Sequence, residues 1–375
     1  MPPYTKLQLL YLVAALAAAL VVFWLPGRLK FLRASLLLRF LVAQALLGGL
    51  GAGVFLHLAK NESLSLAFGA VAGVFYGGAL WLPLLTLVSA RRKSQARVGG
   101  VLVAVLALVV GVDAFFLEPN RLVLREERLP TADWDGTSPF KLVHISDLQT
   151  VGACPRESAA IEMVNSLKPD LIVVTGDFCA GPWTDPGPAI EAARAFNGAL
   201  RARLGVVLIP GHSEPEHVRE KVVKGLDVIY LKNEARRFPL GGGRDLVLWS
   251  IDSIYPKLPP ADLRKKPDDF VVVASHVPDY TVDLAPLDID LHLAGHTHGG
   301  QIAIPGFGPP VTLSKLPREY AHGLHRYGEH FLNVTSGIGM EGHHAPRIRF
   351  QCPPEVSVLR IGGGRDSVSP EGVSE

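Results

Sequence analysis

The hydrophobic pattern of the chain changes character near residue 120. Before that point, four apolar runs are separated by short polar breaks; they span residues 7–25, 34–59, 63–90 and 98–117. Each run reaches the length of about 20 residues that crosses ~30 Å of hydrocarbon. Three further runs follow the first, which argues against a cleaved signal peptide. The pattern therefore predicts a transmembrane region of four helices over residues 1–120.

After about residue 135, short aliphatic segments alternate with amphipathic ones and with Gly/Pro turns, as in an α/β domain. The strand candidates are 141–145, 171–175, 206–210, 245–251, 270–276, 291–296, 330–336 and 356–361. The helix candidates are 156–168 and 190–204. We predict one α/β domain over 121–362 and a disordered tail over 363–375, where apolar periodicity is absent.

Composition supports a chain that lies partly in lipid. Hydrophobic residues make up 48% of it, charged residues only 19%, and the mean hydropathy is +0.26. The 37 Lys and Arg residues nearly balance the 35 Asp and Glu residues, so a nucleic-acid partner is not expected.

Basic residues between the apolar runs predict the orientation. The first loop holds Arg28, Lys30 and Arg33, and the third holds Arg91, Arg92, Lys93 and Arg97. The second loop holds only Lys60. The positive-inside rule then places the α/β domain outside the cytoplasm, although three arginines just after the fourth run favour the opposite orientation. We expect a multi-pass membrane protein with an extracytoplasmic domain.

Acidic and imidazole side chains follow the predicted strands. They are Asp147, Asp177, His212, His276, His296 and His298. Ligands gather outside the carboxyl ends of strands in such sheets. A mixture of carboxylate oxygens and imidazole nitrogens suits Mn, Fe or Zn better than Mg or Ca. Any one of these histidines could be an isolated polar residue, but their joint placement indicates a metal site.

The order of these motifs resembles the signature of the calcineurin-like metallophosphoesterases, in particular a membrane-associated branch. The strongest likeness is AGHTHGGQI at 294–302, supported by SHVPD at 275–279 and by the closing PPEVSVLRI. The resemblance covers roughly residues 140–361. It implies a four-layer α/β/β/α sandwich with a two-metal site.

Carried over by this resemblance, one metal would be held by Asp147, Gln149, Asp177 and His298. The other would be held by Asp177, His212, His276 and His296. Asp177 would bridge two divalent ions, Mn, Fe or Zn, which together neutralise a phosphate and activate water. Gln149 stands where the family has His, so one ion is expected to bind weakly.

A second departure concerns the acid that assists the leaving group. Ser213 stands where the family has a catalytic His, and His212 stands where it has Asn. The predicted catalytic group is therefore Ser213, His212 and His217, the last as a substitute imidazole. Loss of a general acid costs about 10² to 10⁴ in rate.

A late loop supplies the remaining candidates. His343 and His344 could replace the missing imidazole or contact substrate, and Arg347 could bind phosphate oxygens in a bidentate manner. Cys154 and Cys179 could form a disulfide near the site or remain thiols, with Cys352 left over.

The predicted function is metal-dependent hydrolysis of a phosphoester or pyrophosphate bond. The expected partners are the lipid bilayer and a phosphorylated lipid or nucleotide-linked lipid, such as a phospholipid or a UDP-2,3-diacylglucosamine-like molecule. The alternative is a catalytically degenerate metal-binding scaffold or sensor, which Gln149 and Ser213 favour.

Overall fold

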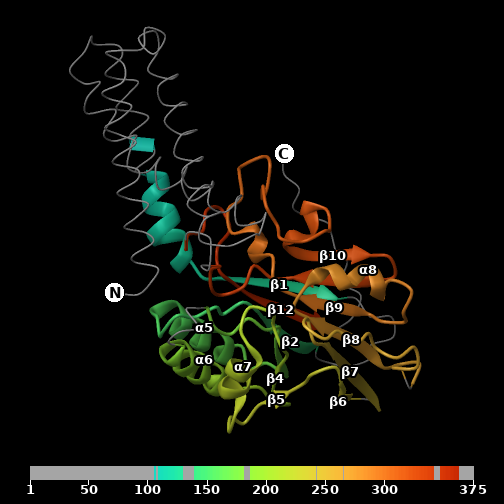
Figure 1. The fold of residues 1–375 in the computed structure, drawn as a ribbon. Helices are drawn as coiled ribbons and strands as arrows, with labels where there is room; N and C mark the ends of the chain where they lie inside the picture. Colours follow the sequence, from blue (N-terminus) through green and yellow to red (C-terminus); the bar gives the residue numbers. More distant parts are fainter. Residues whose placement is uncertain are drawn as a thin grey trace, which may run out of the picture. The chain divides into compact units, whose positions relative to one another are not determined.

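The structure is a computed structural model. It describes residues 105–106, 109–129, 139–180, 186–241, 243–264, 266–341 and 347–362. The chain divides into two compact units. One unit comprises residues 1–117 and 341–348, and the other comprises 118–340 and 349–375. The second unit contains the described strands (Figure 1).

The expectation of a multi-pass membrane protein with an extracytoplasmic domain is contradicted. Among the described residues, no helix has both the length and the apolar character needed to cross a bilayer. Three of the four predicted spans lie outside the described residues, as does the predicted tail 363–375. At the end of the fourth span, Asp113–Leu117 forms the π-helical turn η3, and Glu118–Asn120 forms the 3₁₀ turn η4.

The first sheet has six strands in the order β1-β12-β2-β3-β4-β5. These are β1 (Val123–Leu129), β12 (Glu355–Ile361), β2 (Phe140–Ile145), β3 (Leu171–Val174), β4 (Val206–Leu208) and β5 (Ile229–Tyr230). Strands β2 to β5 run parallel, whereas β12 lies antiparallel to β2. The parallel run brings the loops after β2, β3 and β4 to one edge.

The second sheet also has six strands, in the order β10-β11-β9-β8-β7-β6. These are β10 (Gly323–Tyr327), β11 (His330–Val334), β9 (Leu291–Ala294), β8 (Phe270–Ser275), β7 (Arg244–Ile251) and β6 (Ala235–Gly241). The four central strands are parallel, and both outer strands are antiparallel to their neighbours. The loops after β8 and β9 therefore share an edge as well.

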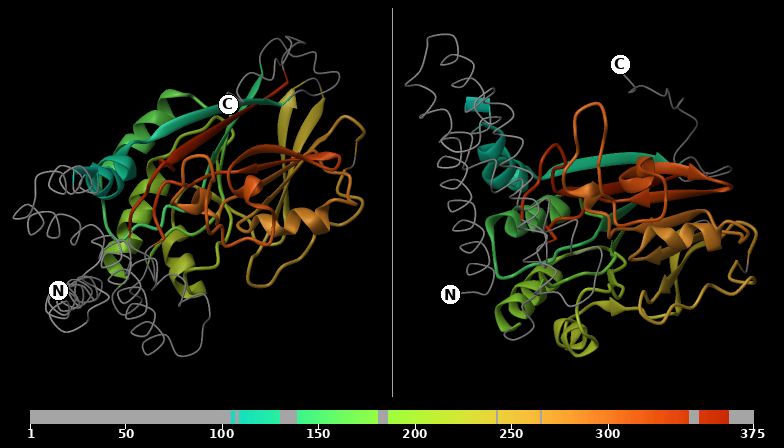
Figure 2. Two further views of the ribbon diagram at one scale, coloured as in Figure 1. Left: turned by 90° about the horizontal axis from the view of Figure 1, so that it is seen from above. Right: turned by 45° about the horizontal axis from the view of Figure 1, so that its top comes forward.

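The two sheets pack face to face through alternating side chains of their strands, and helices lie on the outer side of the first sheet (Figure 2). In β2, Leu142 packs between the sheets, whereas Val143 and Ile145 pack on the opposite face against helices. Those helices are α5 (Pro155–Ser166), α6 (Gly187–Ala199) and α7 (Glu216–Val223).

The outer face of the second sheet is covered by shorter elements. They are η5 (Pro278–Tyr280) and α8 (Thr281–Leu284), whose Leu284 packs with Val271 and Val273 of β8. The order of layers is thus α/β/β/α in the second unit. Its mixed sheets are consistent with a metallophosphoesterase fold.

All eight predicted strands are present, and several of them end earlier than predicted. The predicted segment 291–296, for example, ends as a strand at Ala294, and the segment 206–210 ends at Leu208.

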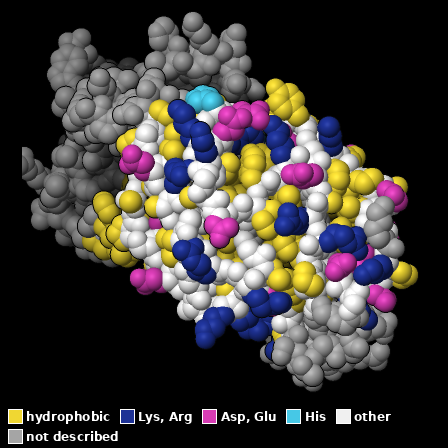
Figure 3. Space-filling view, turned by 90° about the horizontal axis from the view of Figure 1, so that it is seen from below, with side chains coloured by type: hydrophobic (Ala, Val, Ile, Leu, Met, Phe, Trp, Pro, Cys, Tyr) yellow, Lys and Arg dark blue, Asp and Glu magenta, His cyan; other side chains and the backbone are white. Residues whose placement is uncertain are grey.

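Figure 3 shows basic and acidic side chains interspersed among the described residues on one face of the molecule.

Candidate metal centre

The two aspartates of the site occupy strained backbone positions directly after strands of the first sheet. Asp147 has φ 50° and Asp177 has φ 53°, both in the left-handed region that non-glycine residues seldom adopt. The N–H of Asp147 donates to the carbonyl of Gly176 at 3.1 Å, and the N–H of Gln149 donates to the carbonyl of Asp177 at 2.9 Å. These bonds lock the two loops together, so both carboxylates are held beside each other.

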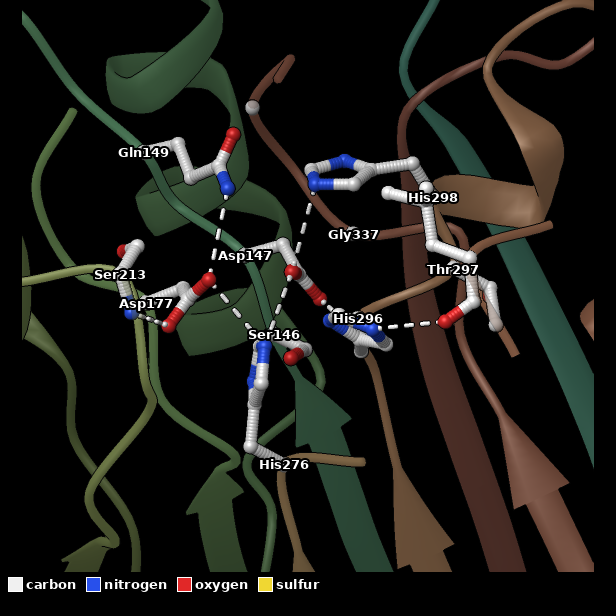
Figure 4. Close-up of polar contacts among 12 residues, drawn as sticks. Ser146, Asp147, Gln149, Asp177, Ser213, His276, His296, Thr297, His298 and Gly337 are labelled. Atoms are coloured by element: carbon white, nitrogen blue, oxygen red, sulfur yellow. Dashed lines mark hydrogen bonds and ion pairs between the residues drawn. The ribbon is translucent and has the colours of Figure 1, made fainter. Parts of the chain in front are cut away.

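Asp177 is oriented by the loop that follows β4. Its Oδ1 accepts the backbone N–H of His212 at 2.8 Å and that of Ser213 at 3.1 Å. This leaves Oδ2 directed toward the centre of the site, 3.1 Å from Nε2 of His276 (Figure 4). One oxygen positions the side chain while the other faces the imidazole.

His276 directly follows β8 of the second sheet, and its tautomer is fixed by a carbonyl. Nδ1 donates to the carbonyl of Thr175 at 2.8 Å, since a carbonyl can only accept. Nε2 is therefore the nitrogen that is available to a cation, and it lies 3.1 Å from Asp177 and 3.8 Å from Asp147. Histidines that ligate metals commonly donate their other N–H in this way.

His296 and His298 lie in the loop after β9, also at positive φ of 70° and 50°. The backbone N–H of His296 donates to Oδ2 of Asp147 at 2.9 Å, and its Nε2 donates to the carbonyl of Leu313 at 3.0 Å. Nδ1 of His296 then keeps the free lone pair. Nε2 of His298 lies 3.4 Å from Oδ1 of Asp147.

The atoms that face one another across the site are buried without hydrogen-bond partners among the described residues. They are Oδ1 of Asp147, Nε2 of His276 and Nε2 of His298. Unpaired buried polar atoms are destabilising unless a further group binds them. A divalent cation is the group that satisfies a carboxylate and two imidazoles at once, so these residues fit a metal.

The described residues contain two sets of possible ligand atoms, and within each set the atoms lie no more than 4.8 Å from one another. One set is Asp147, Asp177 and His276, and the other is His212, His276 and His296. The ring centroids of the three histidines are 4.7 to 5.2 Å apart. The arrangement could hold a divalent cation on each side of Asp177.

The charges of the site reflect this crowding. Burial and the charge of Asp177 raise the pKa of Asp147 to about 6. Burial alone would raise the pKa of Asp177, but His276 and His212 hold it well below its usual range. Burial would also lower the pKa of His276, yet Asp177 and Asp147 raise it to about 10.

The comparisons with known proteins agree with this geometry. Residues 140–300 match the family model described as calcineurin-like phosphoesterase. The chain is 31% identical over 264 residues to the phosphodiesterase YaeI of Escherichia coli, an alignment that spans 66% of this chain and 90% of that protein. The chain belongs to the calcineurin-like phosphoesterase family.

Two further relatives share the phosphoesterase domain. The uncharacterized metallophosphoesterase YkuE of Bacillus subtilis is 28% identical over 66% of this chain and 88% of its own. A Bos taurus transmembrane protein with a metallophosphoesterase domain is 30% identical over 54% of this chain and 49% of its own. This phosphoesterase is therefore a hydrolase that acts on phosphoester bonds, in a family that uses divalent metals.

Gln149 directs its amide nitrogen toward Asp177, and its predicted role as a metal ligand stays a prediction. Nε2 is 3.4 Å from Oδ2 of Asp177, and the side chain is buried (Figure 4). Rotation of the amide group by half a turn exchanges its nitrogen and oxygen, which places an oxygen ligand toward a cation.

Of the three predicted catalytic residues, two lie at the site and the third lies on a helix outside it. His212 is 43% exposed, and its Nδ1 lies 3.6 Å from Asp177. The hydroxyl of Ser213 donates to Glu214 at 2.8 Å. His217 is exposed on α7 and takes part in none of the described contacts of the site.

The late loop and the cysteines complete the predicted residues. His343 and His344 lie outside the described residues, and Arg347 is half-buried in the first unit. Their roles stay predictions. Cys154, Cys179 and Cys352 are all free thiols, so the possible disulfide between the first two is not formed.

Two buried residues near the phosphoesterase site were not predicted. Glu214 accepts the N–H of Phe178 at 3.1 Å, and burial raises its pKa to about 7. Arg349 donates to the carbonyls of Ser336 and Gly339 at 2.7 and 2.6 Å. Glu214 directly follows the predicted catalytic residues His212 and Ser213, and this position could have identified it. Arg349 has no such signal, because its partners are backbone carbonyls.

Proposed function

We propose that the chain hydrolyses phosphodiester bonds at a centre of two divalent metal ions. The observation that carries this proposal is the convergence of unpaired buried atoms from Asp147, His276 and His298 around the carboxylate of Asp177. Such an arrangement is destabilising without a cation and well matched to one.

The proposed ligands divide into two sets that share Asp177. Asp147, Gln149 and His298 complete one set, and His212, His276 and His296 complete the other. Carboxylate and imidazole ligands favour Mn, Fe or Zn. The set with Gln149 has an amide in place of an imidazole, so it holds its ion more weakly. Bound ions supply charge neutralisation for the phosphoryl oxygens and a lower pKa for water.

The side chains of the site bind and orient the substrate rather than donate a proton. His212 is the most exposed of the three clustered imidazoles, so a substrate entering from solvent meets it first. Ser213 donates its hydroxyl to Glu214 and offers no imidazole to the leaving group. Substrates with a good leaving group, which departs without a proton, are therefore favoured over those that release an alkoxide. For the latter, hydrolysis should be slower by about 10² to 10⁴ than with a general acid in place.

The substrate class is a finer proposal. The relative YaeI is named a phosphodiesterase, which supports a phosphodiester as the scissile bond. The likeness to the membrane-associated branch supports a phosphorylated or nucleotide-linked lipid as the molecule that carries it. A scaffold or sensor without turnover is the competing hypothesis, and the same experiment separates the two.

The test is hydrolysis of bis-p-nitrophenyl phosphate by the full chain with added Mn²⁺, followed by a panel of phospholipids and UDP-linked acyl sugars. We expect metal-dependent turnover that Asp177→Asn abolishes. The matched control is Asp283→Asn on the exposed face of α8, which should retain wild-type turnover. Metal binding without turnover of any substrate would support the scaffold instead.

A further inference from the structure

The loop that follows His296 and His298 contains a strained residue, Leu313, whose carbonyl reaches the site. Leu313 has φ 56°, in the left-handed region that a branched side chain rarely adopts. Its carbonyl accepts the Nε2 proton of His296 at 3.0 Å. Strain of this kind persists only where neighbouring contacts impose it, and it gathers at functional sites.

The two residues that follow Leu313 are held by Asp279. Its carboxylate accepts the hydroxyl of Ser314 and the backbone N–H of Lys315, the latter at 3.1 Å to each oxygen. Two consecutive residues directly after Leu313 are thus held by one side chain. Asp279 in turn lies three residues after His276, at the start of η5.

The carbonyl of Leu313 decides which nitrogen of His296 can bind a cation. A carbonyl only accepts, so Nε2 of His296 carries the proton and Nδ1 keeps its lone pair. His276 is controlled in the opposite sense, because its Nδ1–H donates to the carbonyl of Thr175 and its Nε2 faces Asp177. The two rings, with centroids 5.2 Å apart, therefore present different nitrogens to the same centre.

We propose that Asp279 is a positioning residue for the metal centre. It holds the turn at Leu313, and the Leu313 carbonyl sets the tautomer and ring orientation of His296. Asp279 does not touch the metal or the substrate in this role. The inference rests on the proposed metal centre and adds the residue that prepares one of its ligands.

Removing the carboxylate tests the first link. In the full chain, Asp279→Ala should weaken Mn²⁺ binding, measured by isothermal titration calorimetry, by about 10- to 100-fold, as loss of a residue that orients a ligand does. Asp279→Asn keeps one carbonyl oxygen for Ser314 and Lys315, so it should restore most of the affinity. Asp283→Ala, which removes an exposed carboxylate four residues away, is the matched control and should bind as wild type.

A pair of substitutions at Leu313 tests the second link. Leu313→Gly removes the whole side chain but adopts positive φ freely, so the carbonyl stays in place and Mn²⁺ affinity should stay near wild type. Leu313→Val keeps an apolar side chain but resists positive φ, so the affinity should fall. If the Leu313 side chain itself were required, Leu313→Val would bind Mn²⁺ more tightly than Leu313→Gly.

The outcomes separate this inference from the proposed function. If the wild type binds Mn²⁺ and hydrolyses bis-p-nitrophenyl phosphate while Asp279→Ala binds equally well, the positioning role is overturned and the function stands. If the wild type binds no Mn²⁺, both are overturned. Should Asp279→Ala fail to fold, the order of Leu313→Gly and Leu313→Val decides the question.

Discussion

At the scale of single residues, the site depends on glycines that permit close approach. A Cβ at Gly211 would lie 2.0 Å from Oδ1 of Asp177, and one at Gly295 would lie 2.2 Å from Oδ2 of Asp147. The carboxylates therefore occupy the volume that any larger residue would fill. Glycine at these positions is required by contact with the proposed ligands.

Gly211→Ala should accordingly displace Asp177. We expect a loss of about 1–3 kcal/mol in the free energy of unfolding from overpacking, together with weaker binding of Mn²⁺. Gly225→Ala is the control, because it has φ 72° but no atom within 4 Å of the added Cβ. It should cost roughly 1–2 kcal/mol of stability and leave Mn²⁺ affinity unchanged. Equal affinities for both variants would contradict this account of Gly211.

Gln149→His should strengthen the weaker half of the centre. An imidazole is a better donor to a transition metal than an amide, so metal content per chain and turnover should both rise. Elemental analysis after gel filtration in Mn²⁺ measures the first. A variant with unchanged metal content would show that position 149 does not face the cation.

At the scale of elements, the sequence predicted the strands that carry the site because their aliphatic runs are buried on both faces. Strand β1 was missed because VLREERL reads as polar, yet it pairs with β12 at the edge of the first sheet. Contacts between side chains and backbone groups were also missed, such as those of Asp279 with the N–H of Lys315 and of Arg349 with the carbonyl of Gly339. A backbone donor or acceptor has no residue signature, so such contacts appear only when the loops are folded.

Asn333 of the second sheet makes polar contacts with the first sheet. Asn333 of β11 donates Nδ2 to Nδ1 of His144 in β2 at 2.7 Å, and Nε2 of His144 donates to the hydroxyl of Thr175 at 2.9 Å. Because the carbonyl of Thr175 holds His276, this contact connects the packing of the sheets with the site.

Asn333→Leu should therefore leave His144 buried without its donor and cost about 1–3 kcal/mol in urea unfolding. The double variant His144→Leu/Asn333→Leu should lose less than the sum of the two single losses, since both partners become apolar. Strict additivity would show that the two residues do not interact in solution.

At the scale of the whole molecule, the centre exists only where the two sheets meet. Asp147 and Asp177 come from the first sheet, and His276, His296 and His298 come from the second. The strand-end pattern made this set visible in the sequence. The electrostatics of the site, in which the pKa values of Asp147 and His276 are both raised, required the folded distances.

Global stability should depend on pH through Glu355. Burial would raise its pKa, but the hydrogen bond from His322 and the charge of Arg125 hold it at about 2, below the ordinary value of 4.5. The stabilisation is therefore complete above pH 4.5 and is lost as the pH falls toward 2. We expect Glu355→Gln to be less stable than the wild type at pH 6 by about 3 kcal/mol. Its free energy of unfolding should also fall less steeply as the pH drops from 4.5 toward 2, because the variant lacks this titrating carboxyl. Parallel declines in both proteins would contradict the assignment.

The most direct test of the metal centre is anomalous diffraction from crystals of the full chain grown with Mn²⁺. The account predicts anomalous peaks beside Asp177, one bordered by His276 and His296 and a weaker one bordered by Asp147 and His298. Both peaks should be absent from Asp177→Asn. Crystals that contain Mn²⁺ but show no peak beside Asp177, or show one only elsewhere, would contradict the central claim.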